Sequence, residues 1–143
     1  NNSLARSSLA ESLQRQGFEV RLGNTSVVGP VDVAAEFFVE ELRKMAERRS
    51  EGRRVAMVAG GELTLRVHGT GRGGRNQHLA LLMLEKMCAY DGATFAAFST
   101  DGIDGPTDAS GAFVDISVVK TAARLGLSPR DFLQRCDSYE FFR

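Results

Sequence analysis

The chain has 143 residues, of which 43% are hydrophobic, and 18 lysines and arginines balance 18 aspartates and glutamates. This length suits one domain or a piece of a larger protein, and the hydrophobic content opposes disorder. The net charge is zero and the basic residues are scattered, so the chain lacks the basic patch that is typical of nucleic-acid-binding proteins. The apolar runs are shorter than the roughly 18 residues that cross a bilayer. We therefore expect a soluble protein that contacts neither nucleic acid nor membrane.

Two cysteines, Cys88 and Cys136, are too few for a disulfide framework and suit the reducing cytoplasm, which is the expected location. Cys88 continues an apolar helical pattern and is interpreted as a small core residue. His68 and His78 have no neighbouring cysteine, so a zinc site is not expected.

Helical and strand patterns alternate along the first part of the chain. Apolar spacing predicts helices over residues 3–16 and from about residue 30 to residue 49, with a strand over residues 18–22 between them. A compact apolar run at residues 55–59 predicts a strand that is buried on both faces. The turn at Gly60-Gly61, followed by alternating residues 63–68, predicts an antiparallel pair.

The second part of the chain contains two irregular segments between predicted elements. The glycine loop (residues 69–74) leads into a helix predicted over residues 78–90, and the aspartate loop (residues 100–108) follows a strand predicted over residues 94–99. Helices are predicted over residues 116–125 and from Pro129 to about residue 135. The predicted fold is α/β, with a layered mixed sheet and helices packed on it.

The glycine loop has the composition of an anion-binding segment. Glycines let a backbone approach a ligand closely, N–H groups at a helix start point toward an anion, and Arg72 and Arg75 add two guanidinium groups. The alternative is a mobile turn with solvated arginines. The spacing of Gly69, Gly71 and Gly74 also satisfies the dinucleotide-binding fingerprint, although the arginines are not part of that pattern.

The aspartate loop places carboxylates and hydroxyls on an irregular backbone after a strand. Asp101 and Asp104 are close enough in sequence to converge on a hard cation such as Mg²⁺, and one aspartate could accept a proton from a substrate hydroxyl. The alternative is that aspartates and threonines here close turns or cap helices, which is how we interpret Asp108.

Four motifs resemble one known family. Residues 60–64 (Gly-Gly-Glu-Leu-Thr), residues 71–77 (Gly-Arg-Gly-Gly-Arg-Asn-Gln), residues 100–112 and the aromatic end at residues 137–142 are similar to the MOFRL domain of glycerate 2-kinases. The resemblance implies that residues 51–143 form a MOFRL-like domain that lacks its last segment, and that residues 1–50 lead into it.

The family resemblance implies ATP- and Mg²⁺-dependent phosphate transfer to a hydroxyl of D-glycerate, in a cleft between this domain and a larger N-terminal one. It implies catalytic roles for Arg75 and Asp101, and a metal site at Asp101 and Asp104. Substrate or phosphate binding is expected for Gly71, Arg72, Gly73, Gly74, Asn76, Thr100 and Thr107.

The chain is expected to be a fragment of a two-domain enzyme and to be inactive alone, because the family's N-terminal part with its phosphate-binding lysine is missing. Two alternatives remain open. One is an NAD(P)-dependent hydroxypyruvate reductase, a label that some family members carry, and the other is a non-catalytic, stand-alone binding domain. Pairing into a homodimer is also left open.

Overall fold

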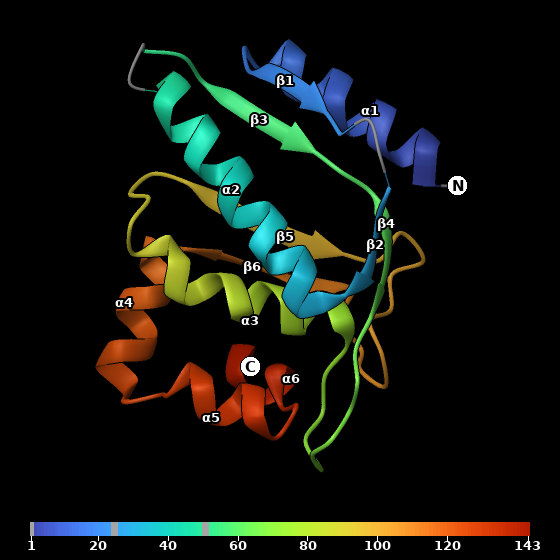
Figure 1. The fold of residues 1–143 in the computed structure, drawn as a ribbon, viewed down its shortest axis with the longest axis vertical. Helices are drawn as coiled ribbons and strands as arrows, with labels where there is room; N and C mark the ends of the chain where they lie inside the picture. The colour runs from blue at the N-terminus through green and yellow to red at the C-terminus, as the bar shows by residue number, and fades with distance from the viewer. Residues whose placement is uncertain (1, 24–25, 50–51) are drawn as a thin grey trace.

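The computed structural model describes residues 2–23, 26–49 and 52–143, and its architecture is mixed α/β, as predicted. The helices are α1 (Asn2–Arg15), α2 (Val31–Arg49), α3 (Arg75–Met87), α4 (Ile116–Leu125), α5 (Pro129–Gln134) and α6 (Ser138–Phe142). The strands are β1 (Glu19–Leu22), β2 (Val27–Pro30), β3 (Val55–Val58), β4 (Gly61–Thr64), β5 (Thr94–Phe98) and β6 (Gly111–Asp115). Figure 1 shows α1, β1 and β3 at one end of the molecule and α5 and α6 at the other. Within these residues, no helix is long and apolar enough to cross a membrane.

The first four strands form two parallel pairs, so the predicted antiparallel pair at Gly60-Gly61 is wrong. β1 pairs with β3, and β2 pairs with β4, both in parallel. The Val27 N–H donates to the Gly60 carbonyl at 2.9 Å where the second pair begins. A Cβ on Gly61 would lie 2.6 Å from the Val27 carbonyl carbon. Glycine is therefore required here because two chain segments approach closely, and not because the chain reverses.

The segment between β4 and α3 is less regular than predicted. β4 ends at Thr64, and residues 65–74 form neither helix nor strand, so the strand predicted over residues 63–68 is largely absent. α3 begins at Arg75, three residues before its predicted start. The glycine loop therefore leads directly into α3, and Arg75, Asn76 and Gln77 form its first turn.

β5 and β6 form an antiparallel pair that the aspartate loop connects. The sequence predicts β5 but not β6, which begins with a glycine and runs directly into α4. Its register places Val114 opposite Phe95, and both side chains are buried. Phe113 faces the other way and is exposed. The pairing holds the two ends of the aspartate loop side by side.

α3 occupies the centre of the core (Figure 1). It packs against α2, β5, β6 and α5, and the side chains of Leu81, Met83 and Met87 are fully buried. A helix surrounded in this way is apolar on most of its surface, which explains its clear sequence signal. Cys88, at the end of this helix, is exposed, so its interpretation as a core residue is wrong. The site at the start of α3 rests on a well-packed helix.

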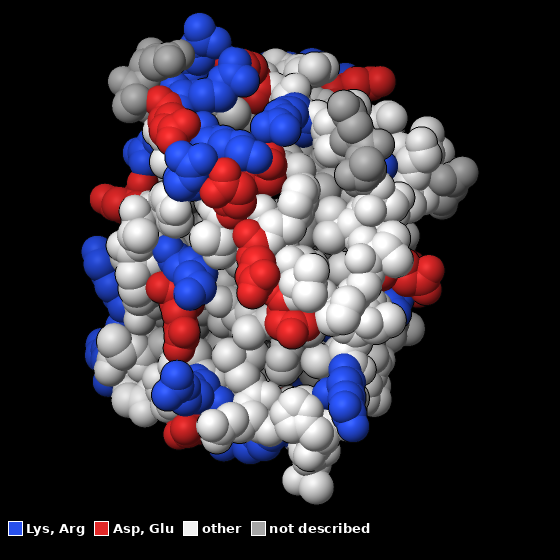
Figure 2. Space-filling view, viewed as in Figure 1, with Lys and Arg blue, Asp and Glu red and all other residues white. Residues whose placement is uncertain are grey.

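The charged residues of α2 lie on the molecular surface, where acidic and basic side chains alternate (Figure 2). Arg43 pairs with Glu40 at 2.9 Å, and Lys44 pairs with Glu41 at 2.8 Å. Glu41 differs from its neighbours because it is buried. The boundary predicted between residues 50 and 51 lies outside the described residues.

Candidate functional site

The glycine loop packs against the C-terminal segment (residues 135–143). The Gly71 N–H donates to the Arg135 carbonyl at 2.9 Å, and the Tyr139 N–H donates to the Arg72 carbonyl at 2.9 Å. Two main-chain hydrogen bonds in opposite directions thus fix the loop on this segment. This anchoring opposes the alternative of a mobile glycine turn.

Two glycines of the loop are needed for this close fit. A Cβ on Gly71 would lie 2.6 Å from Asp137 Cα, and a Cβ on Gly73 would lie 3.2 Å from the Ser138 nitrogen and closer still to its hydroxyl. Larger residues would therefore push the loop off the C-terminal segment. The sequence predicts that these glycines admit a ligand, whereas in the structure they admit another part of the chain.

Asp104 caps the start of α3. Its Oδ1 accepts from the Asn76 N–H at 3.1 Å and from Asn76 Nδ2 at 3.0 Å, and its Oδ2 accepts from the Gln77 N–H at 2.8 Å. The side chain is 1% exposed, and a Cβ on Gly74 would overlap it. The positive end of α3, where an anion was expected to bind, therefore holds a carboxylate of the chain itself.

Thr107 and Gln77 complete a buried network beneath this cap. Thr107 Oγ1 donates to the Asp104 carbonyl at 2.8 Å and accepts from Gln77 Nε2 at 2.9 Å. Both side chains are buried. The network fixes the aspartate loop against α3, and the Thr107 hydroxyl, predicted to bind substrate or phosphate, is not presented to solvent.

Among the predicted site residues, the exposed side chains are those of Arg72, Arg75, Thr100 and Asp101. Asn76 Nδ2 donates to Ser99 Oγ at 2.8 Å, which places the start of α3 beside the start of the aspartate loop. Asp101 Oδ1 accepts from the backbone N–H two residues later at 3.3 Å, in an Asx turn. Within the described ranges, no side chain pairs with the Arg75 guanidinium. The two predicted catalytic residues therefore lie near the same junction, without direct contact.

Tyr139 joins the glycine loop to the aspartate loop. Its hydroxyl donates to Asp108 Oδ1 at 2.6 Å, and the Arg72 guanidinium lies 4.3 Å from the centre of its ring. The hydrogen bond lowers the pKa of Asp108 and raises the pKa of Tyr139, because it stabilises the carboxylate and the neutral phenol. Asp108 thus contacts α6, and no helix begins after it, so of the two roles expected for it, closing a turn or capping a helix, the helix cap is wrong.

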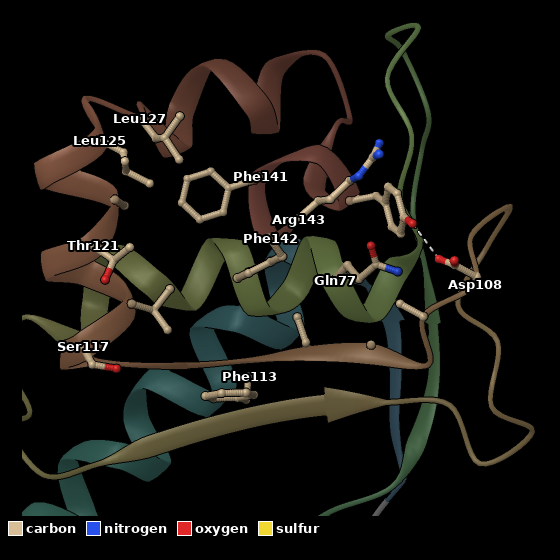
Figure 3. A pocket seen from close by; sticks show the side chains of 16 residues that line it. Gln77, Asp108, Phe113, Ser117, Thr121, Leu125, Leu127, Phe141, Phe142 and Arg143 are labelled. Atoms are coloured by element: carbon tan, nitrogen blue, oxygen red, sulfur yellow. Dashed lines mark hydrogen bonds between the residues drawn. The ribbon is translucent and has the colours of Figure 1, made fainter.

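A cavity of about 590 Å³ lies beside this hydrogen bond, between β6, α4 and α6 (Figure 3). Its wall is largely apolar and includes Val118, Ala122, Leu125, Leu127, Phe141 and Phe142. Asp108 and Arg143 contribute charged groups to its lining. Neither Arg75 nor Asp101 lines it, so the cavity is separate from the predicted catalytic residues.

The structure gives the two aspartates of the predicted metal site different surroundings. Asp104 uses both carboxylate oxygens on N–H donors of α3, whereas Asp101 is exposed. Across the part of the chain that the structure describes, no group of three histidine, cysteine, aspartate or glutamate side chains is arranged to hold a metal ion. Asp104, buried and hydrogen-bonded through both carboxylate oxygens, does not fit the role of Mg²⁺ ligand expected for it, whereas Asp101 is open to a cation held mainly by substrate phosphates.

The sequence over residues 55–143 matches the MOFRL family. The chain belongs to this family. It is 36% identical over 142 residues to the glycerate 2-kinase of Pyrococcus horikoshii, a match that covers 98% of this chain and 32% of that protein. It is also 36% identical over 132 residues to the D-glycerate 2-kinase of Thermotoga maritima, covering 91% of this chain and 32% of the relative.

The fold of this MOFRL chain is similar to the crystal structure of glycerate kinase from Thermotoga maritima. The TM-score is 0.86 at 30% identity, and the match covers 99% of this chain and 34% of that one. The MOFRL chain thus spans about a third of the length of the relatives that it matches. The family resemblance seen in the motifs is confirmed.

Two residues that organise this site in the MOFRL chain fall outside the predicted set. Gln77 directly follows Arg75-Asn76, and Tyr139 lies in the aromatic C-terminal motif, so their membership of these motifs is the signal that could have found them. The residue types alone do not predict a role in the site, because each side chain hydrogen-bonds to a residue about 30 positions away in the sequence.

Proposed function

We propose that the polypeptide carrying this chain is a glycerate 2-kinase, which transfers phosphate from ATP to a hydroxyl of D-glycerate. Membership of the MOFRL family and two relatives named as glycerate 2-kinases support the proposal. Because the chain spans about a third of these relatives, we propose that it forms the C-terminal part of the enzyme and requires the remainder for catalysis. On this proposal, residues 51–143 form the MOFRL unit and residues 1–50 lead into it.

Among the residues of this chain, Arg75 carries this proposal, because its exposed guanidinium has no side-chain partner in the part of the chain that the structure describes. Phosphate transfer depends mainly on positioning and on neutralising negative charge, both of which an oriented arginine supplies. Arg75 begins a helix whose core is fully buried, and the Asn76–Ser99 hydrogen bond fixes it beside the aspartate loop. We assign Arg75 to the transferring phosphate or the substrate carboxylate.

Asp101 supplies the exposed carboxylate next to this cation. In the proposed reaction it accepts the proton of the attacking hydroxyl, a role that requires an accessible group within hydrogen-bond reach of substrate. Thr100 precedes it and is also exposed, so it is available to a substrate oxygen. Mg²⁺ dependence, a cytoplasmic location and a homodimer stay predictions, and Asp101 with Asp104 does not provide a metal site by itself.

Hydride transfer to hydroxypyruvate is the alternative that the glycine spacing suggests. A dinucleotide fingerprint requires an open helix N-terminus to receive the pyrophosphate. At the start of α3 the N–H groups of Asn76 and Gln77 already donate to Asp104, and Gly74 is packed against that carboxylate. This geometry argues against a dinucleotide site at the start of α3.

A comparison of two substrates tests the proposal in the full-length gene product that carries this sequence. We expect ATP-dependent phosphorylation of D-glycerate, detected as a phosphoglycerate by phosphorus NMR, and no oxidation of NADH or NADPH with hydroxypyruvate. Cofactor oxidation without phosphorylation would establish the reductase instead. Absence of both reactions would favour the non-catalytic binding domain.

A further inference from the structure

Tyr139 contacts the glycine loop and the aspartate loop through three different groups. Its N–H donates to the Arg72 carbonyl at 2.9 Å, its hydroxyl donates to Asp108 Oδ1 at 2.6 Å, and its ring lies under the Arg72 guanidinium at 4.3 Å. The dashed line in Figure 3 marks the hydroxyl contact, at the end of α6 that faces the aspartate loop. One side chain therefore connects two loops that are distant in sequence.

These contacts fix both the backbone and the side chain of Arg72. The Arg72 N–H donates to Asp137 Oδ1 at 2.9 Å, and Asp137 Oδ2 in turn pairs with Arg135 Nε at 2.9 Å. With its main chain held on both sides, the direction of the Arg72 guanidinium depends on the ring beneath it. The ring is held by the hydroxyl contact to Asp108. Arg72 is thus oriented before any ligand binds.

A fixed guanidinium binds an anion with less loss of side-chain freedom than a mobile one. We propose that Tyr139 is a positioning residue that holds Arg72 in the direction required to bind an anionic group of a substrate. This inference rests on the proposed function, in which the anion is the carboxylate of D-glycerate or a phosphate of ATP. Tyr139 itself touches neither substrate.

Two substitutions separate the contributions of the hydroxyl and of the ring. Tyr139→Phe removes the hydrogen bond to Asp108 and frees that carboxylate to attract Arg72, while Tyr139→Leu also removes the aromatic face. Tyr90→Phe is the matched control, because Tyr90 carries the only other phenol of the chain and lies three residues beyond the far end of α3. All three are made in the full-length gene product.

We expect KM for one anionic substrate to rise about threefold in Tyr139→Phe and about tenfold in Tyr139→Leu, with kcat within about twofold of wild type. Separate KM values for D-glycerate and ATP identify which anion Arg72 binds. A purely structural role would lower kcat through the fraction of folded enzyme and leave both KM values unchanged. That result, or kinetics equal to those of Tyr90→Phe, would overturn the proposal.

A readout independent of activity separates failure of this inference from failure of the proposed function. Trypsin cleaves after exposed arginines, and release of the glycine loop exposes the bond after Arg72. We expect cleavage there to be at least about threefold faster in Tyr139→Leu than in Tyr90→Phe. Equal cleavage rates would overturn the positioning role. If the wild-type protein does not phosphorylate D-glycerate, the proposed function fails, and the cleavage rates alone decide whether Tyr139 holds Arg72.

Discussion

Replacing Asp104 with asparagine tests whether its carboxylate holds the start of α3. The two carboxylate oxygens accept separately from the backbone N–H groups of Asn76 and Gln77, at 3.1 and 2.8 Å. An amide offers a single oxygen, so its NH2 group must face one of these donors. One of the two buried backbone N–H groups then loses its acceptor and faces the NH2 group of the asparagine.

The size of this effect follows from the burial of the cap. A hydrogen bond to a charged group contributes about 1.5–3 kcal/mol, and a buried donor without an acceptor costs about 1–3 kcal/mol. Because Asp104 is 1% exposed, solvent does not replace the lost partner. We expect Asp104→Asn to destabilise the start of α3 by about 2–3 kcal/mol. Asp101→Asn, in the same loop but exposed, should cost less than about 0.5 kcal/mol.

Hydrogen exchange measured by mass spectrometry in the full-length gene product gives this difference directly. Peptides that cover the first two turns of α3 should exchange at least about 30-fold faster in Asp104→Asn than in wild type. The Asp101→Asn protein should match wild type in the same peptides. Equal exchange in the two variants would refute the capping role and reopen Asp104 as a metal ligand.

Two further predictions concern pH and close packing. Burial lowers the pKa of His78 in the folded protein, so His78 binds a proton more readily in the unfolded chain than in the folded one. The folded protein is therefore at full stability above about pH 6.5, the ordinary pKa of histidine. Its free energy of unfolding falls as the pH drops from there toward the pKa of His78 in the folded protein. Melting temperatures between about pH 7.5 and 5.5 should therefore fall less steeply in His78→Gln than in wild type. His68→Gln should change the slope less, because burial lowers the pKa of His78 more than the charge of His68 does. Identical slopes in all three proteins would contradict this reasoning. Gly61→Ala should cost at least about 2 kcal/mol in thermal unfolding, because its Cβ would lie 2.6 Å from a backbone carbon, against about 1 kcal/mol for Gly126→Ala, where the space is open but φ is 66°. Equal losses of stability in Gly61→Ala and Gly126→Ala would show that backbone conformation, and not close packing, explains why glycine is needed at position 61.

Helices were predictable because their signals are local. The apolar spacing and Gly126 define α4, and that glycine ends the helix in the left-handed conformation. Strand pairing was not predictable in the same way, because Gly60-Gly61 has the composition of a turn. The reason for Gly61 is its contact with Val27, on a segment distant in sequence. β6 gave no separate pattern because it begins with a glycine and runs directly into α4, whose N-cap is its last residue, Asp115.

At the candidate site, too, features set by neighbouring residues could be predicted, and features set by contacts between distant residues could not. Composition indicated that the glycine loop precedes a helix, and the structure confirms this. Composition did not reveal that Asp104 fills the helix start, because this depends on the distance between two loops. The family motifs contained Gln77 and Tyr139, but only the folded chain explains what these side chains contact.

Phosphate transfer from ATP to D-glycerate by the full-length gene product, compared between wild type, Arg75→Ala and Arg124→Ala, tests the central claim most directly. Arg124 is an exposed arginine on α4 and serves as the matched control. We predict that wild type forms phosphoglycerate, that Arg75→Ala lowers kcat/KM by at least about tenfold, and that Arg124→Ala stays within about twofold of wild type. No transfer by the wild-type protein, or equal kinetics in the two variants, would contradict the account.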